Sequence, residues 1–118
     1  MSKFIITRRS DAEFQFNLIA RNGEKILHSE GYTTRENCLN GIESVKSHAH
    51  IDANYEHKIS INSKYYFILK AANGQVIGVS EMYETSVGQE KGIEAVKKNA
   101  GEADVLDRSQ ANLNNTCD

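Results

Sequence analysis

The sequence of 118 residues predicts an α+β fold in which tandem β-β-β-α repeats share one antiparallel sheet, with two helices on one face and a final short strand. Three observations carry this prediction. A long segment recurs at a fixed offset, each copy holds an Asn-Gly turn between apolar segments, and the apolar period changes from two residues to about 3.6 after the turn.

An internal repeat is the strongest of these observations. The segment NGEKILHSEGYT at 22–33 returns as NGQVIGVSEMYE at 73–84, and identical residues recur in one ungapped register from 14–57 to 65–108. A fixed register of this length indicates duplication of one folding unit. We therefore expect a single domain over 1–108, made of repeats at about 3–53 and 54–108.

Each copy begins with strands. KFIIT at 3–7 has the composition of a short first strand, whereas FQFNLIA at 14–20 alternates apolar and polar residues, as YYFILKA does at 65–71. This two-residue period is typical of a strand with one buried face.

An Asn-Gly dipeptide follows in both copies, at 22–23 and at 73–74. This pair favours the positive φ angles of a tight type I′ hairpin turn. We therefore expect KILHSE at 25–30 and VIGVSE at 76–81 to return as antiparallel strands.

Helices should follow the hairpins, because the apolar residues are then spaced by three and four positions. We expect Thr33 with Glu36, and Ser86 with Gln89, to form capping boxes at the two helix starts. A glycine recurs inside each helix, which suggests that the helix backbone passes close to the sheet. The two apolar stripes and the two glycines are Cys38, Ile42, Val45 and Ala49; Gln89, Ile93, Val96 and Ala100; Gly41 and Gly92.

A short strand is expected after each helix, YEHKISI at 55–61 and DVLDR at 104–108. Each helix has a single apolar stripe to bury, so one sheet with both helices on one face satisfies both repeats. Residues 109–118 lack an apolar period and are expected to form a mobile tail.

Composition narrows the functional classes. The net charge of -2 and the pI of about 6.1 provide no global field for a nucleic acid, so that partner is disfavoured. The chain has no apolar run of about 18 residues and its start lacks the pattern of a signal peptide, which predicts a cytoplasmic protein without a membrane segment. Cys38 and Cys117 fit no metal spacing and are expected as free thiols.

The doubled NG…SE-x-Y-x-T unit, with LNGIESVK at 39–46 and EKGIEAVKKNA at 90–100, resembles the YegP-like family of small, uncharacterised bacterial proteins. This resemblance implies tandem repeats that share a single sheet, with the last strand of each unit swapped onto its partner. Residues 55–61 and 104–108 would be the swapped strands. The resemblance implies no established activity and therefore no catalytic residues.

The recurring Ser-Glu-x-Tyr corners are the first candidate ligand site. A hydroxyl, a carboxylate and a phenol near a helix start could form an enzyme site or bind a small anion. The same residues could instead end a strand and cap a helix, and duplication favours this structural role. The candidate residues are Ser29, Glu30, Tyr32, Ser80, Glu81 and Tyr83.

Metal and catalytic sites are not predicted. His48 and His50 point in different directions at a helix end, and His57 lies on the apolar side of its strand. Cys38 lies on the helix stripe, as a small buried residue would. Phosphate-loop patterns are absent, so neither a cofactor nor a catalytic group is expected, and an enzyme is the less favoured class.

The sheet face that the helices leave uncovered is the second candidate. We expect it to present Ile19, Tyr66, Ile68 and Lys70, a mixture suited to a protein partner. The alternative is a weak nucleic-acid binder on the same face, which the acidic pI disfavours. The sequence therefore predicts a small, monomeric, non-enzymatic binding or interaction protein, an internal pseudo-dimer whose ligand, partner and pathway are not encoded in any motif.

Overall fold

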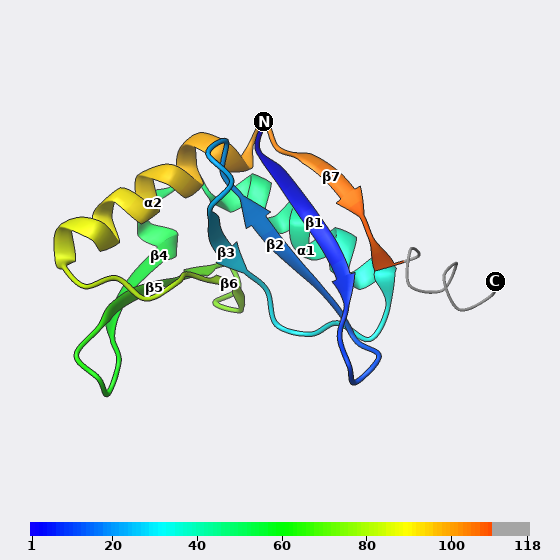
Figure 1. The fold of residues 1–118 in the computed structure, drawn as a ribbon, viewed down its shortest axis with the longest axis horizontal. Helices are drawn as coiled ribbons and strands as arrows, with labels where there is room; N and C mark the ends of the chain where they lie inside the picture. Colours follow the sequence, from blue (N-terminus) through cyan, green and yellow to red (C-terminus); the bar gives the residue numbers. More distant parts are fainter. Residues whose placement is uncertain (110–118) are drawn as a thin grey trace.

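The α+β architecture with two repeats is confirmed in the computed structural model, which describes residues 1–109 (Figure 1). The predicted tail lies outside this range except for Ser109, which is buried and donates its hydroxyl to Asp107 at 2.5 Å. The elements in chain order are β1 Lys3–Arg8, β2 Phe14–Ile19, β3 Lys25–His28, α1 Arg35–His48, the 3-10 turn η1 Asp52–Asn54, β4 Tyr55–Ile59, β5 Tyr65–Lys70, β6 Val76–Val79, α2 Ser86–Ala100 and β7 Asp104–Asp107.

The strands of the described residues form one sheet in the order β4-β5-β6-β3-β2-β1-β7. The two repeats meet at the centre, where His28 of β3 pairs with Val79 of β6. Every pair is antiparallel except β1 with β7. The sheet is therefore mixed, whereas we had predicted an antiparallel sheet. The chain reaches this edge through α2, which connects β6 near the centre of the sheet to β7 beside β1.

The strand after each helix joins the other repeat, as the family resemblance implied. β4 follows α1 but pairs with β5, whereas β7 follows α2 and pairs with β1. Figure 1 shows β7 beside β1 at one edge of the sheet, with β4 near the other. The repeats therefore complete one another instead of folding as separate units.

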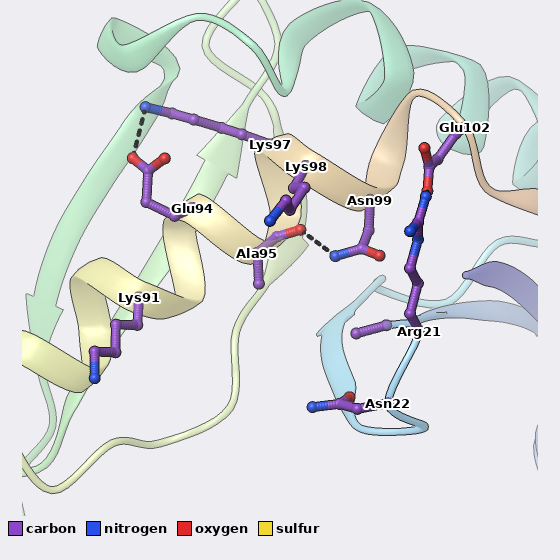
Figure 2. A pocket seen from close by; sticks show the side chains of 10 residues that line it. Arg21, Asn22, Lys91, Glu94, Ala95, Lys97, Lys98, Asn99 and Glu102 are labelled. Carbon is purple, nitrogen blue, oxygen red and sulfur yellow. Dashed lines mark hydrogen bonds and ion pairs between the residues drawn. The ribbon is translucent and has the colours of Figure 1, made fainter. Parts of the chain in front are cut away.

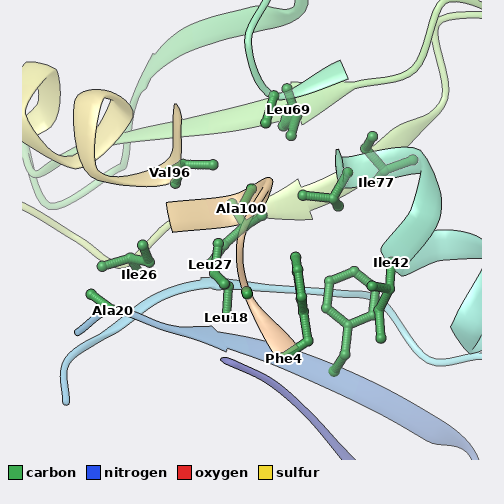
Figure 3. Packing of buried hydrophobic residues seen from close by; sticks show 14 of the residues in the cluster. Phe4, Leu18, Ala20, Ile26, Leu27, Ile42, Leu69, Ile77, Val96 and Ala100 are labelled. Atoms are coloured by element: carbon green, nitrogen blue, oxygen red, sulfur yellow. The ribbon is translucent and has the colours of Figure 1, made fainter. Parts of the chain in front are cut away.

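Both helices cover the same face of the sheet and bury their stripes against it. Ile42 and Val45 of α1 are fully buried, as is Val96 of α2. Figure 3 shows Ile42 and Val96 in one cluster with buried residues of the strands, among them Leu27 and Leu69. The core is thus continuous across the two repeats.

The hairpin turns differ from the predicted type I′. Only the glycines have positive φ, +89° at Gly23 and +87° at Gly74, and neither asparagine does. The Gly23 N–H donates to the Ala20 carbonyl at 2.9 Å, which closes a three-residue loop with glycine in the left-handed region. The Asn22 side chain accepts from the Glu24 N–H at 3.0 Å and fixes this loop instead of supplying a positive φ itself.

The helix caps lie one residue away from the predicted boxes. Thr34 caps α1 by accepting from the Asn37 N–H, and Thr85 caps α2 by accepting from the Gly88 N–H, both at 3.0 Å. Thr33 and Ser86 were therefore the wrong caps. Threonine recurs at 34 and 85, and a cap that serves the fold of each copy is a position that duplication retains.

Candidate functional site

The repeat creates two related clefts, each between a helix and the hairpin turn of the other repeat. The first, here the α2 cleft, has a volume of about 760 Å³ and lies between α2 and the β2–β3 turn (Figure 2). The second, the α1 cleft, has about 470 Å³ and lies between α1 and the β5–β6 turn. Their linings differ in charge, because the sequence of the two copies differs there.

Basic side chains dominate the α2 cleft. Arg21, Lys91, Lys97 and Lys98 line it together with the carboxylates Glu94 and Glu102. Since α2 rises about 1.5 Å per residue, the α-carbons of Lys91 and Lys98 are about 10 Å apart along the same helix face. The cleft therefore presents several positive charges spread over its length.

Ion pairs neutralise some of these charges but not all. Arg21 donates to Glu102 Oε2 through Nε at 2.9 Å and Nη2 at 2.6 Å, and Figure 2 shows the two side chains face to face. Lys97 bonds Asp52 and lies 3.4 Å from Glu94. Lys91 and Lys98 make no ion pair with any residue of the described part of the chain, so they are the cations most available to a ligand.

Asn99 forms part of the wall of the α2 cleft and is 6% exposed. Its Nδ2 donates to the Ala95 carbonyl at 2.7 Å, which fixes the amide on the helix (Figure 2). The backbone carbonyl of Asn99 accepts from the Ser2 hydroxyl at 3.4 Å and connects α2 to the start of the chain. The position is thus held rigidly from two sides.

The α1 cleft is instead lined mostly by neutral groups, and Glu30 is the charged residue in its lining. Asn40 occupies the place of Lys91, and Ser44 that of Ala95. At the place of Asn99 stands His48, which accepts from the Ala72 N–H through Nε2 at 3.1 Å and bonds the Ser44 carbonyl through Nδ1 at 2.7 Å. The histidine ring therefore connects α1 to the hairpin turn.

The serines of the Ser-Glu-x-Tyr corners are buried, and their hydroxyls bond only to the backbone. Ser29 accepts from the Phe16 N–H at 2.9 Å and donates to the Glu30 carbonyl at 2.8 Å. Ser80 makes the same bonds with Phe67 and Glu81 at the same distances. These hydroxyls replace strand-to-strand bonds where each hairpin ends, which is a folding role.

The corner tyrosines pack on the core. Tyr32 stacks on Phe16 with ring centroids 6.3 Å apart, and burial raises the pKa of its phenol. Tyr83 is also stacked, and its pKa is raised for the same reason. Each ring lies directly over a helix glycine, Gly41 or Gly92, so the group nearest to a β-carbon at each glycine would be a tyrosine, and at Gly41 the ring of Phe16 in β2 follows at 3.2 Å.

The corner carboxylates point to different surroundings. Glu30 lines the α1 cleft with Tyr32, whereas Glu81 Oε2 lies 3.7 Å from His28 Nδ1 and 3.8 Å from Lys25 Nζ on the uncovered sheet face. Of the two corners, the first contributes to one of these two clefts and the second to neither. The six residues remain a prediction as a ligand site, and their contacts account for the serines and tyrosines by folding alone.

His48 and His57 bond to different partners. His57 Nε2 lies 2.5 Å from Glu90 Oε2, whereas His48 bonds the Ala72 N–H and the Ser44 carbonyl. Among residues 1–109 no group of three or more His, Cys, Asp and Glu side chains could hold a metal ion. No helix of these residues is long and apolar enough to cross a bilayer.

The predicted partner surface is divided between two places on the uncovered face. Tyr66, Ile68 and Lys70 lie together on β5, but Ile19 on β2 is separated from them by β6 and β3. The pairing register sets two valines of β6 beside this group, Val79 next to Ile68 and Val76 next to Lys70. The apolar patch is therefore formed by β5 and β6, and the valines were missed because strand order is not visible in the sequence.

The basic residues of the α2 cleft were also missed. Lys91 and Lys98 have Asn40 and Ser47 as counterparts in the first copy, and Arg21 has Ala72 as its counterpart in the second. A search for positions that differ between the copies, rather than for positions that agree, would have found them.

Comparison with known proteins places these features in a family context. The domain of unknown function DUF1508 matches residues 10–56 and 61–107, one segment in each repeat. The chain is 48% identical over 104 residues to a UPF0339 protein of Stutzerimonas stutzeri, covering 88% of this chain and 94% of the relative. It is 45% identical over 106 residues to YegP of Escherichia coli K12, covering 90% and 96%. The solution NMR structure of yegP from E. coli, a protein of unknown function, is similar with a TM-score of 0.87 and 44% identity, covering 92% of this chain and 93% of that one.

Proposed function

The chain belongs to the DUF1508 family of domains of unknown function, and on that premise we propose that it is a non-enzymatic binding protein whose ligand site is the α2 cleft. The ligand is a small molecule that carries two or more anionic groups, phosphates or carboxylates. We also propose that the protein is monomeric and cytoplasmic. The internal pairing of repeats, which already completes the sheet centre, supports a monomer.

The difference between the two clefts carries this proposal. Where the fold needs a residue, both copies retain it, as at the serine, tyrosine and glycine of each corner. Arg21, Lys91 and Lys98 each occur in one copy only, yet all three line the same cleft. Folding does not require them, because the counterpart cleft forms without them. Their gathering is the pattern expected when one copy of a duplicated unit acquires a ligand.

The electrostatics of the cleft favour an anion. Four basic side chains face two carboxylates, so the cleft is locally positive in a chain whose net charge is -2. Anionic groups attract the ammonium groups of Lys91 and Lys98, which can move to reach them, whereas the guanidinium of Arg21 is held by Glu102. The distance of about 10 Å between the two lysine α-carbons suits a ligand with more than one charged group.

Binding is better supported than catalysis by the chemistry of the lining. The side chains that line the α2 cleft are lysine, arginine, glutamate, asparagine and alanine, without a hydroxyl, thiol or imidazole. Such groups bind and orient an anion through charge-assisted hydrogen bonds. The lining holds no hydroxyl or thiol nucleophile beside a histidine base, which is the usual arrangement for acyl transfer.

A second candidate, a protein-binding surface on the uncovered sheet face, is supported by the patch of Tyr66, Ile68, Val76 and Val79. These side chains are half-buried and border the ion pair of Lys70 with Glu56, whose atoms are 2.7 Å apart. An apolar centre with a polar rim is the usual composition of a protein interface. Loss of partner binding after Tyr66→Ala with Ile68→Ala would support this surface.

The anion site is tested by following backbone amide NMR shifts during titration with tripolyphosphate and, separately, with citrate. We expect shifts at Arg21, Lys91 and Lys98, and the double substitution Lys91→Gln with Lys98→Gln should weaken binding about tenfold or more. The matched control is Lys3→Gln with Lys25→Gln, which removes the same charge from the uncovered face and should leave the affinity unchanged. Equal weakening by both variants would mean a diffuse charge effect and would refute a built site.

A further inference from the structure

The outer edge of β4 has a covered counterpart within the same molecule. β1 and β4 are equivalent, since each pairs antiparallel with the first strand of the following hairpin, and Phe4 and Ile6 correspond to Tyr55 and His57. β7 covers the other edge of β1, but no strand of residues 1–109 covers that edge of β4. Figure 1 shows the covered edge beside β7 and the uncovered one at the opposite end of the sheet.

The uncovered edge follows from the way in which the duplicated units are joined. β4 follows α1 as β7 follows α2, and it also precedes the β5–β6 hairpin as β1 precedes β2 and β3. One strand thus fills two roles, so the position beside β4 that corresponds to β7 has no segment of this repeat to fill it. The outer edge of β4 is therefore equivalent to the edge of β1 that pairs with β7.

The backbone of β4 directs hydrogen-bonding groups towards that edge. The Ser80 N–H donates to the Phe67 carbonyl at 2.9 Å, so the backbone N–H and C=O groups of Phe67 point towards β6. The backbone groups of the alternate residues of β5 point towards β4. In an antiparallel ladder the residues opposite Phe67 and Leu69, which are His57 and Tyr55, then direct their N–H and C=O groups outwards.

The pairing of β7 with β1 shows how these groups can be satisfied. The Asp104 N–H donates to the Ser2 carbonyl at 3.3 Å, and the Arg108 N–H donates to the Ile6 carbonyl at 2.8 Å. A parallel strand beside β4 would find the equivalent of the Ile6 acceptor at His57, whereas Ala53, the counterpart of Ser2, lies in the turn η1.

The side chains at the two edges specify different strands. Beside β1, Asp107 of β7 lies next to Ile6 and forms an ion pair with Arg35 of α1, with Oδ2 and Nε 3.0 Å apart. Beside β4, the helix offers the opposite charge, because Glu90 of α2 lies over His57 with Nε2 and Oε2 2.5 Å apart. An incoming strand should therefore carry a basic residue at this position.

Apolar positions flank that charge on both sides. Val105 lies beside Phe4 in the covered pair, and its counterpart beside β4 would pack next to the buried ring of Tyr55. Two residues beyond His57, Ile59 is 66% exposed, and Ile61 beyond it is fully exposed. Side chains at alternate positions of a strand share a face, so the partner pattern is apolar, basic, apolar at every second residue.

We propose that the outer edge of β4 binds an extended peptide segment of a partner protein as a strand parallel to β4, with a lysine or arginine beside His57 and Glu90 and apolar residues beside Tyr55 and Ile59. Addition of a strand to a sheet edge is a recurrent mode of peptide recognition, with affinity from the backbone and specificity from alternate side chains. The polar pair His57–Glu90 faces the helix side of the edge and disfavours nonspecific pairing with apolar strands.

Two synthetic peptides test this site, one with the core Val-Ser-Lys-Ser-Val and one with Val-Ser-Glu-Ser-Val, each titrated into the full chain and followed by amide NMR shifts. We expect the lysine peptide to shift the amides of Tyr55, His57 and Ile59 and to bind about fivefold more tightly than the glutamate peptide. In the variant Glu90→Lys the preference should reverse. Reversal cannot come from unfolding, because one of the two peptides then binds better than before.

The matched control is Glu43→Lys, an equal charge change on an exposed position of α1, which should keep the preference for the lysine peptide. An unchanged preference in Glu90→Lys, shifts confined to β7, or no shift with either peptide would overturn the proposal. The same β4 shifts on raising the protein concentration alone, with a mass increase in sedimentation, would overturn it in favour of a second copy as the occupant.

Discussion

The ring of Tyr83 covers Gly92 so closely that a β-carbon at position 92 would lie 2.6 Å from Tyr83 Cζ, and closer still to its hydroxyl oxygen. Tyr32 and Gly41 repeat this contact in the first copy, at 2.8 Å from Cζ. The recurring glycine and the recurring tyrosine are thus one packing device that fastens each helix to the corner before it.

Gly92→Ala should destabilise the protein by about 1–3 kcal/mol, the usual cost of an overpacked site. The helix itself would gain about 1 kcal/mol from the exchange, so a net loss means that the clash outweighs the gain in helix propensity. Urea denaturation measures the free energy of unfolding. The matched control is Gly101→Ala at the end of α2, where nothing lies within 4 Å of a β-carbon and stability should not fall.

Tyr83→Phe in the Gly92→Ala background should restore part of the lost stability, because it removes the atom nearest to the new methyl group. The recovery is partial because Cζ remains. If the double variant is as unstable as Gly92→Ala alone, the hydroxyl is not the group that the methyl displaces.

Ser29→Ala and Ser80→Ala should each lower the free energy of unfolding by about 1–3 kcal/mol, because a buried backbone N–H then loses its acceptor. The N–H groups are those of Phe16 and Phe67. Ser86→Ala on the exposed start of α2 is the control and should change stability little. An effect in only one of the two corners would contradict an equal folding role.

The elements could be predicted because their causes are local. The alternation in 14–20 and the spacing of Ile42 and Val45 follow from which face each element buries, and both repeats provide the same pattern independently. The caps and turns were placed less well, since Thr33 and Thr34 are chemically alike and only the geometry of the chain chooses between them.

The site residues could not be predicted because their neighbours are distant in sequence. Arg21 meets Glu102 across most of the chain, and Ile68 meets Val79 only once the strand order is known. The uncovered edge of β4 likewise depends on which repeat receives each strand after a helix.

Cys38 should resist thiol reagents at neutral pH in the folded protein. Its side chain is fully buried in the core, and burial, with the nearby charge of Asp107, raises the pKa of the thiol to about 11. Since the thiolate is the reactive form, labelling should require unfolding. The rate of reaction with a chromogenic disulfide reagent is measured in the Cys117→Ser background, with and without denaturant. Rapid labelling of the native protein would contradict a buried thiol.

Glu56 should keep its charge well below the usual range of a carboxyl group. Hydrogen bonds from Lys70 and then from Lys58 lower its pKa from the ordinary value of 4.5 to about 2. Because the pKa is lower in the folded state, this carboxylate contributes stability that is complete above pH 4.5 and is lost as the pH falls towards 2. The carbon-13 shift of the Glu56 carboxyl, followed during an acid titration, measures the folded value.

Lys70→Met should raise the pKa of Glu56 towards its ordinary value, but only in part because Lys58 stays within 2.9 Å of the carboxylate. Lys64→Met is the matched control, since Lys64 forms its ion pair with Glu84 instead. An equal rise in both variants would show that net charge, and not the contact across β4 and β5, sets the pKa. A rise confined to Lys70→Met would show that the contact between β4 and β5 sets the pKa of Glu56. The carboxyl shift of Glu56 would then report on peptide binding at the uncovered edge of β4 without involving Glu90.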